Sequence, residues 1–134
     1  MQSNAVKQFS PDDVVTAVLS FIRSEFSNDP EKIHETFYRL HNDTKYKDLL
    51  GNFEFIGYSK FHYSPLLERI LNRLQESRLL SSRNPDYLFY EIKPESRKAI
   101  EAYYLKKGKI LHKQRKQLER IAGELKKELA YARK

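Results

Sequence analysis

The chain of 134 residues contains no cysteine, and all of its apolar stretches are short. The lack of cysteine excludes disulfide bonds and thiolate chemistry and is typical of a protein from a reducing compartment. None of the apolar stretches approaches the ~20 residues that a membrane-spanning helix needs. The segment Met1–Ser10 lacks the charged and apolar parts of a secretory signal. We therefore expect a cytoplasmic protein that has no membrane partner.

Signals of catalysis are also scarce. The sequence has no glycine-rich phosphate loop and no nucleophile elbow. Glu31 and His34 have the spacing of one half of a helical metal motif, but the second half is absent. His34 and His41 are seven residues apart on one helical face, where zinc would need further ligands. We predict that the protein is not an enzyme and has no metal site and no cofactor.

The charge of the chain is unevenly distributed. Its formal net charge of +7 favours an acidic partner such as nucleic acid. Residues 1–104 hold 14 Lys and Arg against 15 Asp and Glu, which gives −1. Residues 105–134 hold 11 against 3, which gives +8. The basic character therefore belongs to the C-terminal segment, and the rest of the chain is close to neutral.

Helix-start signals divide the first part of the chain. Residues 1–9 are predicted to form a flexible tail. Ser10, followed by a proline, predicts the start of the first helix, because serine caps free N–H groups and proline suits the first helical position. Either Asn28 or Asp29 can cap the next helix, which begins at Pro30.

The middle of the chain predicts a helix, a turn, a strand and another helix. Residues 42–62 favour a short helix and then an extended segment that pairs with a later strand. Ser64 and the proline after it start a helix with a buried stripe, formed by Leu67, Ile70, Leu71 and Leu74. The turn-rich stretch 81–86 and the alternating strand Tyr87–Ile92 follow, and a new helix starts at Pro94.

This order of recognition helix, wing hairpin and return helix predicts a winged helix-turn-helix domain over residues 10–104. The fold class is mostly α with a small β wing. The spaced leucines of Leu66–Leu80 and the run Tyr90–Ile100 resemble the end of winged-helix transcriptional regulators, notably the PadR-like group. Regulators of that group often read "tyrosine-x-leucine-threonine-x-x-glycine-arginine" in the second stretch.

The resemblance implies DNA binding and dimerisation through C-terminal helices. The chain departs from the family pattern at three positions. Arg78 stands where the helix-ending glycine is usual, Lys93 stands for the threonine, and Ser96 stands for the glycine. Fold alone does not establish function, because other winged helices bind proteins.

The predicted recognition helix carries the residues that we expect to read DNA. Arg69 and Arg73 lie one turn apart with Asn72 beside them, and in a major groove arginine bonds to guanine and asparagine to adenine. Ser64 lies at the helix start, where free N–H groups suit a phosphate. The alternative is an ordinary solvated face on which these arginines pair with nearby glutamates, and a serine that only caps the helix.

Two further positions flank this helix. Arg83 and Asn84 lie at the predicted wing tip, which in winged helices reaches a minor groove or flanking phosphates. Lys60 precedes the helix and adds a phosphate contact in the same hypothesis.

The C-terminal segment, residues 105–134, predicts a basic helix. Leu111, Leu118 and Leu125 recur every seven residues with Ile121 between them, so we predict a dimerisation seam. Polar residues interrupt this seam, and the alternative is that it folds back on its own domain.

The densest basic run of the sequence consists of seven residues: Lys106, Lys107, Lys109, Lys113, Arg115, Lys116 and Arg120. They are interpreted as contacts to the DNA backbone or as the solvated face of the dimerising helix. A basic helix on a membrane surface is the third reading, which the lack of an aromatic anchor weakens.

The leading functional hypothesis is sequence-specific binding of double-stranded DNA by a homodimeric transcriptional regulator. The alternative is a winged-helix protein–protein interaction module, an adaptor or antitoxin-like partner, for which the near-neutral body of the chain is the reason.

Overall fold

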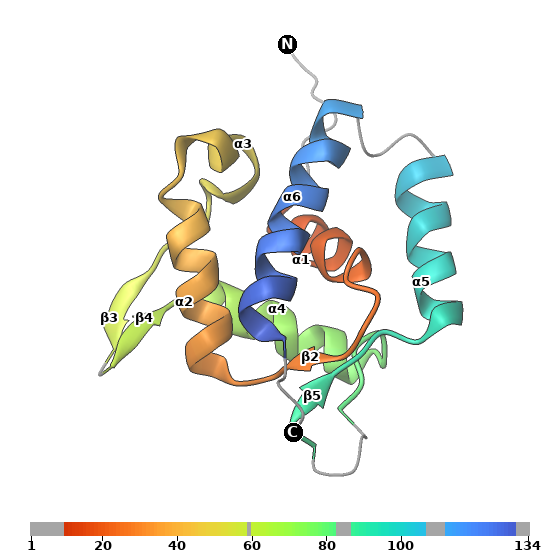
Figure 1. The fold of residues 1–134 in the computed structure, drawn as a ribbon, viewed down its shortest axis with the longest axis horizontal. Helices are drawn as coiled ribbons and strands as arrows, with labels where there is room; N and C mark the ends of the chain where they lie inside the picture. Colours follow the sequence, from red (N-terminus) through yellow and green to blue (C-terminus); the bar gives the residue numbers. More distant parts are fainter. Residues whose placement is uncertain (1–9, 59, 83–86, 107–111, 131–134) are drawn as a thin grey trace.

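The computed structural model describes residues 10–58, 60–82, 87–106 and 112–130 (Figure 1). The described part is mostly helical and contains two small antiparallel sheets of two strands each, which confirms the expected mostly α chain with a small β component. The helices are α1 (Pro11–Ser20), α2 (Pro30–His41), α3 (Lys47–Leu50), α4 (Pro65–Glu76), α5 (Pro94–Glu101), α6 (His112–Leu129), the 3-10 turn η1 (Thr44–Tyr46) and the π-helix η2 (Ala102–Lys106). The strands are β2 (Phe26–Ser27), β3 (Ile56–Tyr58), β4 (Phe61–Tyr63) and β5 (Phe89–Tyr90).

The predicted starts of three helices are confirmed. Ser10 and Asp13 form a capping box at the start of α1, in which each side chain accepts a hydrogen bond from the other residue's backbone N–H. Asp29 caps α2 and Ser64 caps α4, and a proline follows each of these caps. Each cap contributes about 1 kcal/mol to the stability of its helix.

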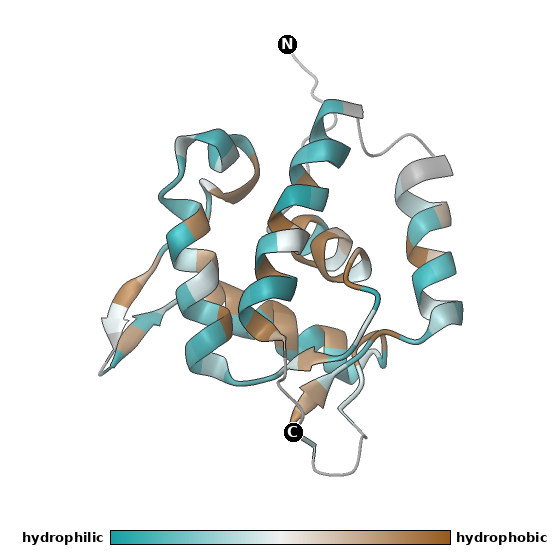
Figure 2. Ribbon diagram, in the orientation of Figure 1, coloured by the Kyte–Doolittle hydropathy of each residue, from teal (hydrophilic) through white to brown (hydrophobic). Residues whose placement is uncertain are grey.

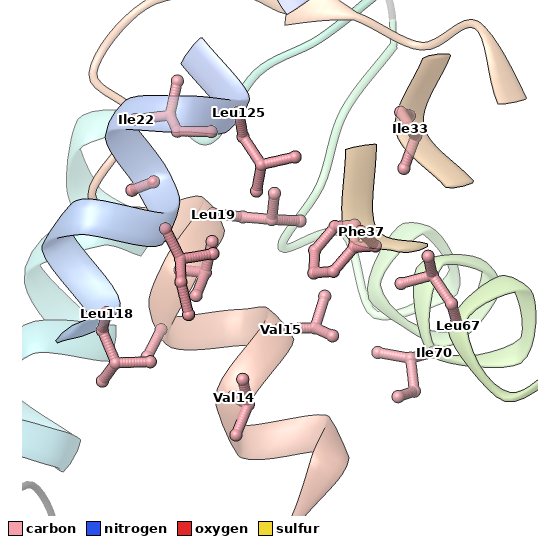
Figure 3. Packing of buried hydrophobic residues seen from close by; sticks show 14 of the residues in the cluster. Val14, Val15, Leu19, Ile22, Ile33, Phe37, Leu67, Ile70, Leu118 and Leu125 are labelled. Carbon is pink, nitrogen blue, oxygen red and sulfur yellow. The ribbon is translucent and has the colours of Figure 1, made fainter. Parts of the chain in front are cut away.

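Helix α1 is the centre of the fold. All of its residues from Val14 to Ser20 are buried, as expected for a helix that is covered on every side. It packs against α3, α4, α5 and α6. In Figure 3 the side chains of α1 lie between Leu118 and Leu125 of α6 on one side and Leu67 and Ile70 of α4 on the other. The buried stripe predicted for α4 is therefore confirmed, and α1 separates α4 from α6.

The region of β5 connects two distant segments of the chain. It pairs with β2 in antiparallel register, with Phe26 opposite Tyr90. Just beyond β5, Glu91 forms a β-bridge with Ser81, which comes shortly after α4. The strand predicted over residues 87–92 is thus shorter than expected, and its two neighbours are the segment between α1 and α2 and the segment after α4.

The prediction that residues within 42–62 pair with this later strand is wrong. Strands β3 and β4 pair with each other instead, with Ile56 opposite Tyr63. A hairpin between neighbouring strands closes a much shorter loop than a pairing with a distant strand does, so it costs less entropy. The Glu35 carboxylate of α2 holds this hairpin, because it accepts the backbone N–H of His62 at 2.9 Å and bonds to its ring. The ring of Tyr38 stacks on the same imidazole at 3.7 Å.

Helix α6 folds back onto its own domain and packs against α1 and α2. The side chains of Leu118, Ile121 and Leu125 are fully buried in the single chain, together with Leu129. The prediction that the first three form a seam between two copies is wrong, because side chains in their own core have no surface left for a second copy. The predicted partner Leu111 lies outside the described residues.

Candidate nucleic-acid interface

The outer face of α4 brings together the residues predicted to read DNA. Because the apolar stripe of α4 points into the core, Arg69, Asn72 and Arg73 point outward and are exposed. Glu76 is exposed on the same face one turn later. The face is therefore polar and nearly neutral, with two arginines, one amide and one carboxylate.

One of these arginines is already paired. The Arg73 guanidinium lies 3.0 Å from the Asp12 carboxylate in the first turn of α1. Both side chains are about half exposed, so the pair contributes only about 0–1 kcal/mol to stability. An interaction this weak can be exchanged for one with a nucleic acid. Local sequence patterns could not predict this ion pair, because the two residues belong to helices far apart in the chain.

Ser64 does not have the role that was predicted for it. Its side chain is fully buried, and its hydroxyl accepts the backbone N–H of Leu67 at 3.1 Å. A phosphate cannot reach a hydroxyl that is both buried and occupied. The expectation that Ser64 binds DNA is therefore wrong, whereas the alternative that it only caps the helix is correct.

His34 positions the start of α4. Its ring is fully buried, and its Nδ1 accepts the backbone N–H of Ser64 at 3.1 Å. Its Nε2 lies 2.9 Å from the Glu68 carboxylate, and the ring stacks on Tyr63 at 4.7 Å. Since Nδ1 accepts a hydrogen bond, the ring hydrogen lies on Nε2 and is donated to Glu68. The imidazole thus ties α2 to the first turn of α4.

On the sequence alone, His34 was a candidate metal ligand and nothing more. Its partners in the structure come 30 and 34 residues later in the chain, so no local spacing could have indicated them. Within the described ranges, no group of three or more His, Cys, Asp or Glu residues is arranged to hold a metal ion.

A basic pocket of about 380 Å³ lies at the end of α4 beside the predicted wing. Arg78 and Lys93 line it, together with Gln75, Leu80, Ser81, Ser82 and Tyr87. None of these residues is a carboxylate. Arg78 and Tyr87 both have left-handed backbones, with φ of 68° and 55°. Such strain in non-glycine residues is concentrated at functional sites in proteins.

One residue of the pocket wall, Gln75, is held by the buried Tyr90. The Tyr90 hydroxyl accepts a hydrogen bond from the Gln75 side chain at 3.1 Å. Burial, and then the nearby charge of Glu68, raise the pKa of Tyr90 above its usual value. The phenol therefore stays protonated, and Gln75 keeps a constant orientation in the pocket wall.

Some of the remaining predicted DNA contacts lie in the described part of the structure, and others do not. Lys60 is exposed in the turn that precedes β4, and Lys113 is exposed in the first turn of α6. Arg83, Asn84, Lys107 and Lys109 lie outside the described residues. Lys106 ends η2, but its side chain lies outside the described part of the structure.

A larger groove, of about 640 Å³, runs along the outer side of α2. Acidic and basic residues alternate along it, and Arg39 is within ion-pair distance of both Glu124 and Glu128 of α6. At one edge, Glu35 meets His62. Burial raises the pKa of Glu35, but the hydrogen bonds and the charge of His62 outweigh this, and the net shift is downward. These groups neutralise one another, so the groove has no convergent set of groups for a ligand.

Comparison of the chain with protein-family models, with curated proteins and with solved structures gave no match. Among the helices of the described residues, none is long and apolar enough to cross a membrane.

Proposed function

We propose that this chain is a winged helix-turn-helix protein that binds double-stranded DNA in a sequence-specific manner and regulates transcription. One observation carries the proposal: the strand between α1 and α2 pairs with the strand after α4, which in turn bridges to Ser81 directly after α4. A wing hairpin that follows a recognition helix and pairs with a first strand has this order. The exposed polar face of α4 then occupies the position of a recognition helix.

Two details support the resemblance to the PadR-like regulators. Arg78 stands where that pattern has a glycine, and its φ of 68° is the conformation that glycine adopts most easily. Arg97 stands at the arginine of the pattern, and its guanidinium donates to the backbone carbonyls of Ser20, Ile22 and Ile92. It thus joins the end of α1 to the start of α5.

In the proposed complex, α4 lies in a major groove. Arg69 and Arg73 bond to guanine and Asn72 to adenine, which are the base contacts that these side chains make best. Arg78 and Lys93 of the basic pocket, and Lys60 on the other flank, contact phosphates and fix the register. A homodimer remains part of the proposal, but it needs a surface other than the buried leucines of α6.

The test is a binding selection on random duplexes, followed by gel-shift titration of the selected sequences. The triple variant Arg69→Ala, Asn72→Ala, Arg73→Ala should lose about 10- to 100-fold in affinity for selected duplexes and lose its base preference. A matched control is Arg23→Ala with Arg39→Ala, which removes two exposed arginines from other elements. Equal losses in both variants would reject α4 as the reading element.

A second candidate function is a protein–protein interaction module. Its support is an exposed apolar pair beside the predicted wing, because Tyr87 is 67% and Leu88 is 49% exposed. Pairs of this kind are common in protein interfaces. Co-purification of a partner that the double variant Tyr87→Ser, Leu88→Ser no longer binds, with no selection of duplex sequences, would favour this function over the first.

A further inference from the structure

The outer face of α6 carries a straight row of cations, Lys113, Lys116, Arg120 and Lys127, which we call the basic stripe. Their spacings of three, four and seven residues place them on one line along the helix. All four are exposed, and none forms an ion pair with any residue that the structure describes. Figure 2 shows that the side of α6 turned to the viewer is largely hydrophilic. The stripe runs from residue 113 to residue 127, a rise of about 21 Å along the helix.

The acidic residues of α6 do not neutralise this stripe. Glu119 accepts a hydrogen bond from Arg115 at 3.2 Å. Glu124 and Glu128 lie on the flank of α6 next to α2, where Arg39 meets both of them. Arg115 and Arg39 are thus the cations that the three carboxylates of α6 contact, and none of the four residues of the stripe forms an ion pair within the described structure.

The buried side of α6 decides which kind of acidic partner fits. A basic helix that lies on a membrane inserts its apolar side between lipids. Here that side, formed by Leu118, Ile121, Leu125 and Leu129, is fully buried in the domain core. It is available neither to lipid nor to a partner helix, so only the charged side can bind.

The absence of aromatic residues narrows the choice further. Proteins that bind single strands stack bases on aromatic side chains. From residue 113 to residue 130 the sequence contains no Phe, Tyr or Trp. A row of cations without a stacking platform matches the regular phosphate backbone of a duplex, of which about 21 Å corresponds to about six phosphates on one strand.

The stripe faces away from α4. Helix α6 packs on α1 and α2, α4 packs on α1, and the core side chains of α1 lie between the two helices (Figures 1 and 3). A straight duplex that lies against α4 of one copy is therefore out of reach of the stripe of that copy.

We propose that the basic stripe of α6 binds the phosphate backbone of duplex DNA without base preference, as a second site independent of α4. Binding at the stripe does not rest on the proposed function. When α4 also holds a duplex, one copy of the protein holds two DNA segments together.

Gly123 provides a clean test of the stripe. It lies on the same line of α6, it is exposed, and a Cβ atom added there meets no atom of a neighbouring element within 4 Å. Gly123→Glu places a carboxylate within the stripe, Gly123→Lys adds a cation, and Gly123→Gln is the uncharged control of similar size. All three replace glycine by a better helix former, so none is expected to unfold the protein.

The first measurement is affinity for an unselected duplex over a salt series, with the full chain. Relative to Gly123→Gln, we expect Gly123→Lys to bind about fivefold tighter and Gly123→Glu about fivefold weaker, the effect of one charge pair in water. The lysine should steepen the slope of log K against log salt by about 0.9. Equal affinities and slopes for all three variants would overturn the proposal, as would tighter binding of single-stranded RNA or of anionic vesicles than of the duplex.

The second measurement is bridging, in which one duplex is fixed to beads and a second, labelled duplex is captured through the protein. Changing all four stripe residues to Gln should abolish capture but leave selective binding through α4 intact. If the α4 variant still binds unselected duplex through the stripe but selects no sequence, the proposed function fails and the stripe stands. If the four-residue variant binds unselected duplex as well as wild type does, the stripe fails and the proposed function stands.

Discussion

Helices α4 and α6 are built alike but differ in the charge of their exposed faces. Each packs an apolar stripe onto α1 and turns a polar face to solvent. The face of α4 is nearly neutral, and one of its arginines is paired with Asp12. The face of α6 has a row of four cations without acidic partners in the described structure.

The net charge of +7 does not distinguish two requirements of DNA binding, whereas the charges of the two separate faces do. Selectivity for bases needs a few directed donors and acceptors, whereas affinity for phosphates needs uniform positive charge. In the proposed complexes α4 therefore relies on its directed contacts and on the flanking cations Arg78, Lys93 and Lys60, because the charge of α6 is out of reach of the duplex that α4 binds. The comparison also shows that an uneven charge along a sequence can become an uneven charge across the two sides of one domain.

The largest expected effect tests whether α6 belongs to the domain as fully as α4 does. Leu125→Ala should lower the free energy of unfolding by about 2–5 kcal/mol, because it leaves a cavity in a fully buried position. Urea unfolding measures this change, with Lys126→Ala on the exposed side as control. A loss below about 1 kcal/mol would mean that α6 is an appended helix and not part of the core.

The next effect concerns how α4 is held. His34→Ala should cost about 2–4 kcal/mol, because it leaves the Ser64 N–H and part of the Glu68 carboxylate without partners and opens a cavity. His41→Ala is the control, because that ring is less buried, bonds to the neighbouring Asn42 and otherwise contacts the ring of Phe55. Equal unfolding free energies for the two variants would show that His34 does not position α4.

Substitution of Arg78 should change stability and duplex binding in opposite directions. Arg78→Gly should raise the unfolding free energy by about 1 kcal/mol, because glycine adopts the left-handed backbone without strain. The same change should weaken duplex binding, because the basic pocket loses a cation. Arg78→Ala keeps the strain and loses only the guanidinium. If both variants bind duplex as wild type does, the pocket takes no part in binding.

A smaller effect comes from the ion pair on α4. Asp12→Asn should change the unfolding free energy by no more than about 1 kcal/mol. It releases Arg73 and removes a negative charge beside the reading face, so affinity for selected duplexes should rise a few-fold. Glu119→Gln makes the corresponding change on α6 by releasing Arg115. It should improve binding of unselected duplex instead, and the opposite pattern would contradict the assignment of the two faces.

The smallest effect is a pH dependence at the β3–β4 hairpin. The pKa of Glu35 is lowered below its usual 4.5, so its pairing with His62 stabilises the fold above that pH. This contribution is lost as the pH falls through the lowered pKa. Wild type should therefore lose more stability than Glu35→Gln does in urea titrations between about pH 6 and pH 3. Parallel curves for the two proteins would show that the pairing adds nothing.

What the sequence predicted correctly was local. Ser10, Asp29 and Ser64 each stand before a proline. The cap and the proline act only on the first turn of the helix, so three helix starts could be predicted without knowledge of the fold. The buried stripe of α4 follows from helical spacing alone. The exposure of Arg69 and Asn72 follows in turn from that stripe.

What the sequence could not predict depends on distant partners. The same leucine spacing in α6 fits a seam between two copies and a stripe on its own core, and only the three-dimensional packing distinguishes them. Ser64 illustrates the same limit, because its role as a cap was clear but its burial beneath His34 was not. The pairing of β3 with β4 was missed since the short turn between them is not marked by a typical turn sequence.

The enclosed part of α1, Val14–Ser20, has a consequence for how this protein could change over time. Substitutions on α4 and on α6 affect surfaces that share no exposed residue, and this buried segment between them contributes nothing to either surface. In the proposed DNA complexes, selectivity for bases and affinity for phosphates can therefore be altered in separate steps, each without a compensating change on the other side of the domain. Variation should accumulate freely on both outer faces and be resisted in the segment from Val14 to Ser20.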